Sequence, residues 1–318
     1  MNPVKEKVRH KGRIGQTGIY LAKFARMFFY QSDWKVLPMA AIITCLVVFV
    51  VGQNLFVTQE GTTTGAFALV CVCIWIGFFN SIQVVCRERE IVKREHRSGL
   101  HITSYIAAQM IFQMVICLLQ TGIVLLICRS RFSGVQIPRN GLVTPYGITD
   151  MAITIFLTTY AADMMALMIS CIVHNSTTAM TVMPFMLIFQ LIFSGGFFEL
   201  HGMAQSITAL TVSHWGLISL CAVGRFNAQP MVTLWNTLFK FRNIEYMGEK
   251  PLLELIKKTE REGKVQDFLL WSGSYNQKSE YVSSQANVLH TWQALLILTA
   301  VFVIIAIIML EFIDRDKR

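Results

Sequence analysis

The sequence predicts an all-α membrane protein. Of its 318 residues, 54% are hydrophobic and only 15% are charged, whereas soluble domains carry about 25% charged residues. Apolar stretches of about 20 residues, the length of a membrane-spanning helix, recur along the chain. The apolar content excludes a disordered chain, and the counts of 20 Gly and 7 Pro without a repeat exclude a collagen-like one.

Six stretches are long and apolar enough to span a membrane. Five are clear and the sixth is slightly less apolar; in chain order they are Val36–Phe56, Ala66–Cys86, Tyr105–Cys128, Ile148–Val173, the less apolar Thr178–Phe198, and Leu289–Phe312. The chain therefore divides into an amino-terminal segment (1–35), a membrane region (36–226), a polar region (227–288) and a last span with a short tail (289–318).

The positions of the cations predict the orientation. Eight Lys and Arg precede residue 36, five lie within 87–97 and three end the chain, a distribution typical of cytoplasmic flanks rather than of a nucleic-acid site. Both termini are then cytoplasmic, as in a multi-pass protein of the cell membrane. Arg129, Arg131 and Arg139 fall outside, against the rule, but they are outnumbered.

The polar interval before the last span predicts an external cap. Residues 203–226 are half apolar and are interrupted by His214 and Gly216, which favours a re-entrant segment. Residues 227–288 are polar, with an amphipathic run after Pro251. The alternative makes 203–226 a seventh span and moves the cap into the cytoplasm.

Before the first span, residues 19–30 form one apolar helical face with Leu21, Phe24, Ala25 and Phe28, while Lys23 and Arg26 point elsewhere. This pattern suits a helix lying in the inner membrane interface. A simple lead-in to the first span fits the pattern equally well.

Enzymatic and metal-site motifs are missing from the sequence. It contains no HExxH, no GxSxG and no GxxxxGK[ST] phosphate loop. His96 and His101 are five residues apart, a poor spacing for two metal ligands on one helix. The eight cysteines lie in or beside apolar runs and indicate neither disulfides nor a zinc site. We expect no catalytic residue, metal or cofactor on this chain.

The segment 86–99 continues the second span with dense charge. On composition alone it is a solvated helix extension, supported by the i,i+4 pair of Glu90 and Arg94. Its order of residues, however, resembles the permease domain of type-2 ATP-binding cassette exporters, especially the G subfamily and similar bacterial permeases. That family has two glutamates seven residues apart after the second span, a glycine four residues later and a tyrosine opening the third span, and this chain matches with Glu88, Glu95, Gly99 and Tyr105. The resemblance extends through 161–170, 193–200 and 214–215, and so covers most of 19–227 and the last span.

The resemblance implies a partner and a contact surface. It implies that residues 95–103, within a linker of 87–104, form a coupling helix in a cleft of a cytoplasmic ATPase subunit, and that 19–30 is the connecting helix. ATP and Mg would bind that partner and not this chain, and a second permease copy or a paralogue would complete the transporter. The residues assigned to ATPase coupling are Glu88, Glu95, His96, Arg97, Ser98 and Gly99. Where several relatives have two leucines as a plug, this chain has Gly196 and Phe197.

Polar and flexible side chains within the spans suggest a substrate path. Asp163 lies near the middle of the fourth span, where an acid is a functional hypothesis by default and an interhelical hydrogen bond is the structural one. Gln109, Gln113 and Gln120 form a polar stripe that faces a path or binds Asp163 and Asn80. Methionines such as Met186 suit varied apolar ligands but also ordinary packing. The candidate pathway or gate residues are Asn80, Gln113, Asp163, Met186, Phe197 and Phe198.

These observations predict the permease half of an ATP-driven exporter of an amphipathic or hydrophobic substrate (a peptide, lipid or drug), with a central aromatic and methionine-lined cavity that alternates its access. One alternative is an ion-coupled secondary transporter that uses Asp163, although the spans show no inverted repeat. Another is a membrane sensor or scaffold whose external cap binds a ligand.

Overall fold

The structure, a computed structural model, describes residues 12–196, 202–245 and 249–312. Within these residues the regular elements are helices, and a single isolated bridge joins Asn140 to Tyr146. The α-helices are α1 (Arg13–Tyr30), α2 (Val36–Val51), α3 (Gln59–Ser81), α4 (Val84–Arg97), α5 (Ile102–Arg129), α6 (Gly147–Ile172), α7 (Ser176–Ile192), α8 (Met203–Thr208), α9 (Val212–Val223), α10 (Thr233–Lys240), α11 (Pro251–Arg261), α12 (Val265–Ser274) and α13 (Gln285–Glu311).

Five segments are long and apolar enough to cross a membrane: Asp33–Val51, Gln59–Arg97, Ile102–Arg129, Gly147–Ile172 and Gln285–Glu311. They confirm the all-helical membrane fold and five of the predicted spans. The predicted span Thr178–Phe198 corresponds to α7, which has 17 residues and contains Pro184. At 1.5 Å per residue α7 is about 25 Å long, shorter than the roughly 30 Å of a bilayer core. Among the described residues, helix length therefore supports five crossings, and α7 falls short of a full one.

Helix α6 is the centre of the bundle. Of the 18 consecutive residues that form its most apolar stretch, 78% are buried. The corresponding share is 17% for the segment Asp33–Val51, which contains α2. Helices α3, α9 and α13 pack around α6, and Gly77 of α3 lies so close to α6 that an added Cβ would be 2.5 Å from the carbonyl oxygen of Thr159. Because α2 exposes Ile42, Leu46 and Phe49, it suits a peripheral position facing lipid.

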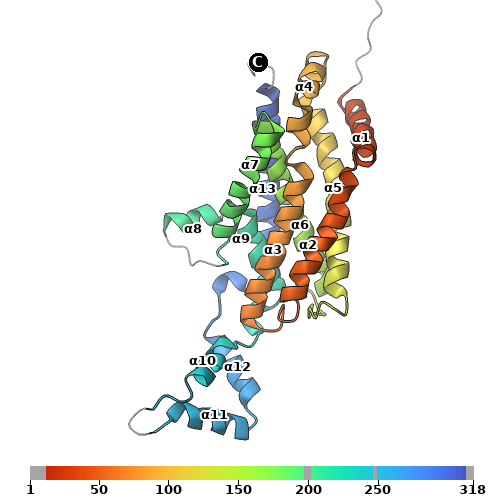
Figure 1. Ribbon diagram of the computed structural model, residues 1–318. Coiled ribbons are helices and arrows are strands. Elements are labelled where there is room, and N and C mark those ends of the chain that lie inside the picture. The colour runs from red at the N-terminus through yellow and green to blue at the C-terminus, as the bar shows by residue number, and fades with distance from the viewer. Residues whose placement is uncertain (1–11, 197–201, 246–248, 313–318) are drawn as a thin grey trace, which may run out of the picture.

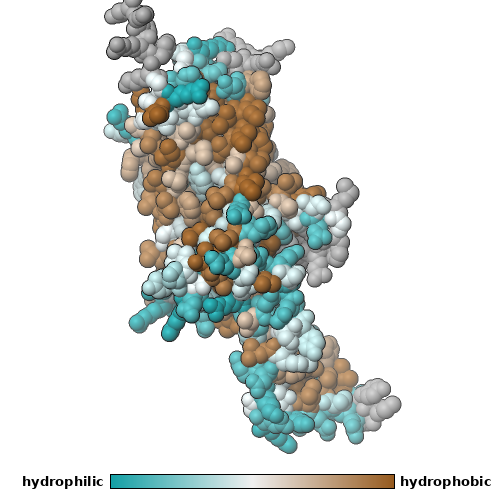
Figure 2. All heavy atoms as spheres, turned by 180° about the vertical axis from the view of Figure 1, so that it is seen from behind, coloured by the Kyte–Doolittle hydropathy of each residue, from teal (hydrophilic) through white to brown (hydrophobic). Residues whose placement is uncertain are grey.

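The two ends of the bundle differ. Helix α1, the turn between α4 and α5, and the end of α13 lie at one end, and α10–α12 project from the opposite end (Figure 1). Two residues at the start of α3 anchor that projection: Gln59 Nε2 donates to the Gly273 carbonyl at 3.0 Å, and Glu60 accepts from the backbone of Thr233 at 2.7 Å. Figure 2 shows hydrophobic side chains over much of the back of the bundle and hydrophilic ones gathered near its two ends.

The segment predicted to be re-entrant contains two separate helices, α8 and α9. Helix α9 begins beside the end of α7, where the Ser213 amide donates to Gln190 Oε1 at 3.0 Å. It ends near the α2–α3 connection, where Gly224 lies against Phe56. Its 12 residues are about 18 Å long, and the projecting helices that follow lie opposite the α4–α5 turn. The projecting helices and the α4–α5 turn therefore lie at opposite ends of the bundle (Figure 1).

Candidate functional site

The turn between α4 and α5 has a defined geometry. Helix α4 ends in a Schellman-type cap, in which the Leu100 amide donates to the Glu95 carbonyl at 3.0 Å. Gly99 adopts φ +103°, a conformation that favours glycine. Leu100 is buried, while Arg97, Ser98 and Gly99 are exposed at the tip. The predicted coupling helix 95–103 is thus the end of α4, a tight turn and the first residues of α5, rather than one separate helix.

Helix α1 holds this turn from one side. The Gln16 side chain joins it by two bonds, donating to the Gly99 carbonyl at 3.1 Å and accepting from the His101 amide at 3.0 Å. Lys23 Nζ lies 3.3 Å from Glu88 Oε2 and 3.9 Å from Glu95 Oε1. One ammonium group therefore connects two carboxylates that are seven residues apart on α4.

Aromatic packing accompanies these ion pairs. Tyr20 and Phe24 each meet the Tyr105 ring edge to face, with centroids 5.5 Å apart. The Tyr20 hydroxyl donates to Glu95 Oε2 at 2.7 Å. Burial, and then the neighbouring Glu95 carboxylate, raise the pKa of Tyr20 above its ordinary value, so Tyr20 remains a hydrogen-bond donor at neutral pH.

The structure thus divides the predicted coupling residues into two groups. Glu88 and Glu95 turn toward α1, and the Glu88 side chain is only 8% exposed. Arg97, Ser98 and Gly99 form the exposed tip, with His96 partly exposed beside them. The exposed part of this turn is therefore its tip, while the two glutamates lie against α1.

The intramembrane polar residues form a buried network between helices. Asn80 of α3 and Gln120 of α5 exchange two amide hydrogen bonds at 2.8 and 2.9 Å. Gln113 Nε2 donates to the Asn80 carbonyl at 3.3 Å. All three side chains are at most 9% exposed. For Gln113 and Gln120 this geometry favours helix attachment, with Asn80 rather than Asp163 as the partner, whereas Gln109 Oε1 has no partner within the described residues.

Asp163 lies next to this network but is bonded differently. Its Oδ2 accepts from the Cys117 thiol at 3.3 Å, and its Oδ1 has no partner within the described residues. The side chain is fully buried, and among the described residues no cation forms an ion pair with it. The structure therefore brings Asn80, Gln113 and Asp163 together at the α3–α5–α6 contact.

A separate apolar groove of about 500 Å³ lies between α2, α3 and α7. Phe67, Trp75 and Leu191 are among its lining residues, and methionine is not among the lining residues that the structure describes. Met186 is half-buried on α7 and packs against the core. Phe197 and Phe198 lie outside the described residues.

Sequence reasoning missed the residues of α1 that complete the turn. Lys23 was expected to point away from the apolar face, but it reaches Glu88 and Glu95, while Ala25 of that expected face is exposed. The spacing of Tyr20, Lys23 and Phe24 on one side of α1 was a usable signal. To predict the contact with Glu88 and Glu95 from this spacing, the position of α4 is also required, and the local sequence pattern does not contain it.

Comparison with known proteins identifies the family of this chain. The family model for the ABC-2 type transporter matches residues 21–222, more than half of the chain, from α1 through most of α9. An ABC transporter ATP-binding/permease protein of Mycobacterium tuberculosis is 26% identical over 152 residues, which make up 47% of this chain and 17% of that protein. The matched model describes a permease part and not an ATPase. The chain, with its apolar spans and its charged turn clamped by α1, belongs to the ABC-2 type transporter family.

Proposed function

We propose that this chain is the membrane subunit of an ATP-driven exporter for an amphipathic or hydrophobic substrate, such as a peptide, lipid or drug. The observation that carries the proposal is the exposed tip of the α4–α5 turn, which α1 holds through Gln16 and Lys23, while the start of α4 bonds to Ser170 of α6. A charged tip on a stiff helix pair suits complementary ion pairs with a partner and the transmission of rigid-body motion.

The partner in this proposal is a cytoplasmic ATPase subunit that binds ATP and Mg. The similar mycobacterial protein combines ATP-binding and permease in its name, whereas this sequence contains no phosphate-binding loop motif. Closure of two ATPase subunits on ATP would move the tips of two permease subunits, which are two copies of this chain or this chain and a paralogue.

The membrane topology in this proposal has six crossings with both termini in the cytoplasm of a cell-membrane protein. Helix α7 forms the fifth crossing, within the predicted span Thr178–Phe198, and α9 packs beside its end, where the Ser213 amide donates to Gln190 Oε1. Residues 203–226 then form the re-entrant segment, and α10–α12 form the external cap.

The substrate path in this proposal follows the groove between α2, α3 and α7. Its aromatic and aliphatic lining suits an apolar ligand, and a second subunit on this face would close it into a central cavity. Asp163 lies outside this lining and is fully buried, which supports a structural role over an ion site.

The test of coupling uses the chain with its ATPase in proteoliposomes. Arg97→Ala at the tip should leave the protein inserted and folded but lower transport per ATP hydrolysed. Arg261→Ala, which removes an arginine from the exposed end of α11, is the matched control and should leave coupling unchanged. Normal coupling in Arg97→Ala would count against the tip as the contact.

The test of topology uses an impermeant maleimide on intact cells. Ser274 and Ser98 are both exposed, at opposite ends of the bundle. A cysteine at Ser274 should react and one at Ser98 should not, and the reverse result would invert the orientation.

Asp163→Asn separates the exporter from the ion-coupled alternative. This change keeps hydrogen-bonding capacity and removes a charge that costs about 2.5–3.5 kcal/mol in a membrane. We expect ATP-dependent transport to persist. Transport that runs on an imposed proton gradient without ATP, and that is lost in this variant, would overturn the exporter proposal.

A further inference from the structure

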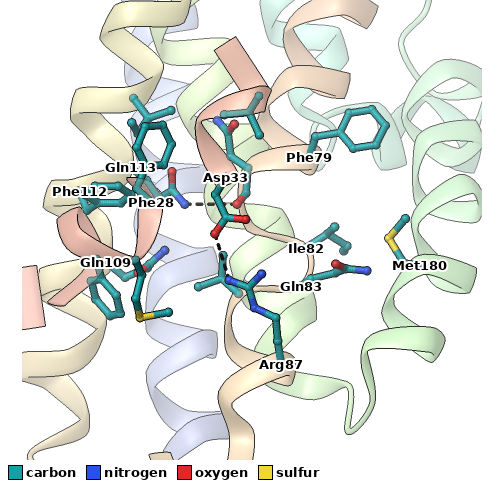
Figure 3. A pocket seen from close by; sticks show the side chains of 16 residues that line it. Phe28, Asp33, Phe79, Ile82, Gln83, Arg87, Gln109, Phe112, Gln113 and Met180 are labelled. Atoms are coloured by element: carbon teal, nitrogen blue, oxygen red, sulfur yellow. Dashed lines mark hydrogen bonds and ion pairs between the residues drawn. The ribbon is translucent and has the colours of Figure 1, made fainter. Parts of the chain in front are cut away.

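A second cavity, of about 160 Å³, lies at the end of the bundle where α1 packs (Figure 3). Its walls come from α1, the start of α2, the break between α3 and α4, α5 and α7. It is separate from the apolar groove described above, and its composition is different. Four aromatic rings line it together with charged and amide side chains, namely Phe24, Phe28, Phe79 and Phe112.

An ion pair lies at the mouth of this cavity. Arg87 donates from its Nη2 to Asp33 Oδ2 at 3.1 Å, and each side chain is 40% exposed. Both groups are therefore reachable from outside and keep capacity for further hydrogen bonds. Asp33 lies between α1 and the apolar α2, at the boundary where a membrane headgroup meets a spanning helix.

Deeper in the cavity, the amide oxygen of one buried side chain has no hydrogen-bond donor. Gln109 is 2% exposed, and its Oε1 receives no hydrogen bond from the described residues. Figure 3 shows Gln109 and Gln113 reaching into the pocket from α5, with Asp33 between them and Arg87. A buried unpaired acceptor is costly, so a ligand that fits here brings an N–H or O–H donor.

We propose that this cavity binds the headgroup of phosphatidylethanolamine. This headgroup consists of a primary ammonium group joined to a phosphodiester. The ammonium donates to Asp33 and to Gln109 Oε1 and lies against the aromatic rings, which attract cations. The phosphodiester accepts from Arg87, which binds phosphate oxygens well.

This chemistry discriminates among lipids. Phosphatidylcholine has a cationic headgroup without an N–H donor and leaves Gln109 Oε1 unpaired. Phosphatidylglycerol has hydroxyl donors but no cation to match Asp33. The headgroup alone fits a volume of about 160 Å³, so the acyl chains stay in the surrounding bilayer.

The experiment measures lipid retention by native mass spectrometry on the purified full chain. The chain is exposed to dioleoyl phosphatidylethanolamine, phosphatidylcholine or phosphatidylglycerol, which share acyl chains. We expect phosphatidylethanolamine to be retained about tenfold more than either other lipid, as charge-assisted hydrogen bonds imply. Equal retention of the three lipids is the result expected for a cavity that holds only solvent, and it would overturn the proposal. This comparison uses the wild-type chain alone and so does not depend on the folding of a variant.

Variants locate the binding. Asp33→Asn and Gln109→Leu should each reduce the preference about tenfold. Glu262→Gln is the matched control for Asp33→Asn, since Glu262 pairs with Lys264 at 2.8 Å with comparable exposure on the cap, and it should keep the preference. A preference that survives in both pocket variants would place the lipid elsewhere. Soluble glycerophosphoethanolamine should not displace the lipid, and displacement at equal concentration would assign the site to a soluble ligand instead.

Discussion

The α1-clamped turn and the Asn80 network lie on successive stretches of α3, α4 and α5, yet they hold their polar groups in different ways. At the turn, Lys23 joins Glu88 and Glu95. Inside the bundle, Asn80 and Gln120 exchange two neutral amide bonds. The cation of the turn, Lys23, is 29% exposed, whereas Asn80 and Gln120 are at most 9% exposed.

The difference follows from solvation. Partly exposed charges, such as Lys23 at 29% and Glu95 at 35%, keep part of their hydration and lose little on pairing. A charge inside a membrane loses hydration altogether. Reciprocal amides satisfy each other without that loss. We therefore expect the buried region to set the stability of the fold and the turn to set its coupling.

The largest expected effect concerns the helix contact beneath the network. An added Cβ at Gly77 would lie 2.8 Å from the Asp163 amide nitrogen, whereas one at Gly122 on α5 would meet nothing within 4 Å. Gly77→Ala should therefore destabilise the chain by about 1–3 kcal/mol through overpacking. Gly122→Ala, its matched control, should be neutral or slightly stabilising because alanine favours helix. Thermal unfolding in detergent measures both, and equal melting temperatures would contradict a tight α3–α6 contact.

The next effect is that of the amide pair. Asn80→Leu leaves the Gln120 amide unpaired in an apolar contact and should cost about 1–3 kcal/mol. The double variant Asn80→Leu/Gln120→Leu removes both partners and should recover part of that loss. A double-mutant cycle on unfolding free energies measures the coupling. If the two single changes simply add, the amides do not act as a pair.

A smaller effect is expected at the clamp. Lys23→Met keeps the length of the side chain but leaves Glu88, 8% exposed, without its cation. We expect a loss of about 1–2 kcal/mol, between the values for exposed and buried pairs. Lys264→Met removes the cation of an exposed pair and should leave the unfolding free energy almost unchanged. A loss in Lys264→Met as large as in Lys23→Met would remove the distinction between the two pairs.

The smallest effect depends on pH. Since burial and the Glu95 carboxylate raise the pKa of Tyr20 above 10.0, the folded chain holds this proton more tightly than the unfolded chain. The contribution of Tyr20 to stability is therefore fully present below about pH 10 and is lost as the pH rises further. Tyr20→Phe should be slightly less stable than wild type at pH 8, and the difference should shrink above pH 10. A difference that grows with pH would reverse the assignment of the donor.

The apolar runs predicted the spans because helix formation in a membrane is a local requirement. Tyr105–Cys128 and Ile148–Val173 differ from α5 and α6 by only a few residues. The amphipathic run after Pro251 became α11, with Pro251 in its first turn. Ala66–Cys86 was placed less well, since the chain breaks at 82–83 between α3 and α4, and no Pro or Gly marks the break.

The sequence by itself determined the membrane class of this protein, the approximate positions of its long helices and the charged, glycine-terminated turn, because these depend on residues close together along the chain. Only the tertiary structure decided the partners of the polar groups. The bonds of Tyr20 to Glu95, Gln59 to Gly273 and Asn80 to Gln120 join residues 75, 214 and 40 positions apart. Periodicity places each side chain on a face of its own helix, but helix packing selects the face of another helix that it meets.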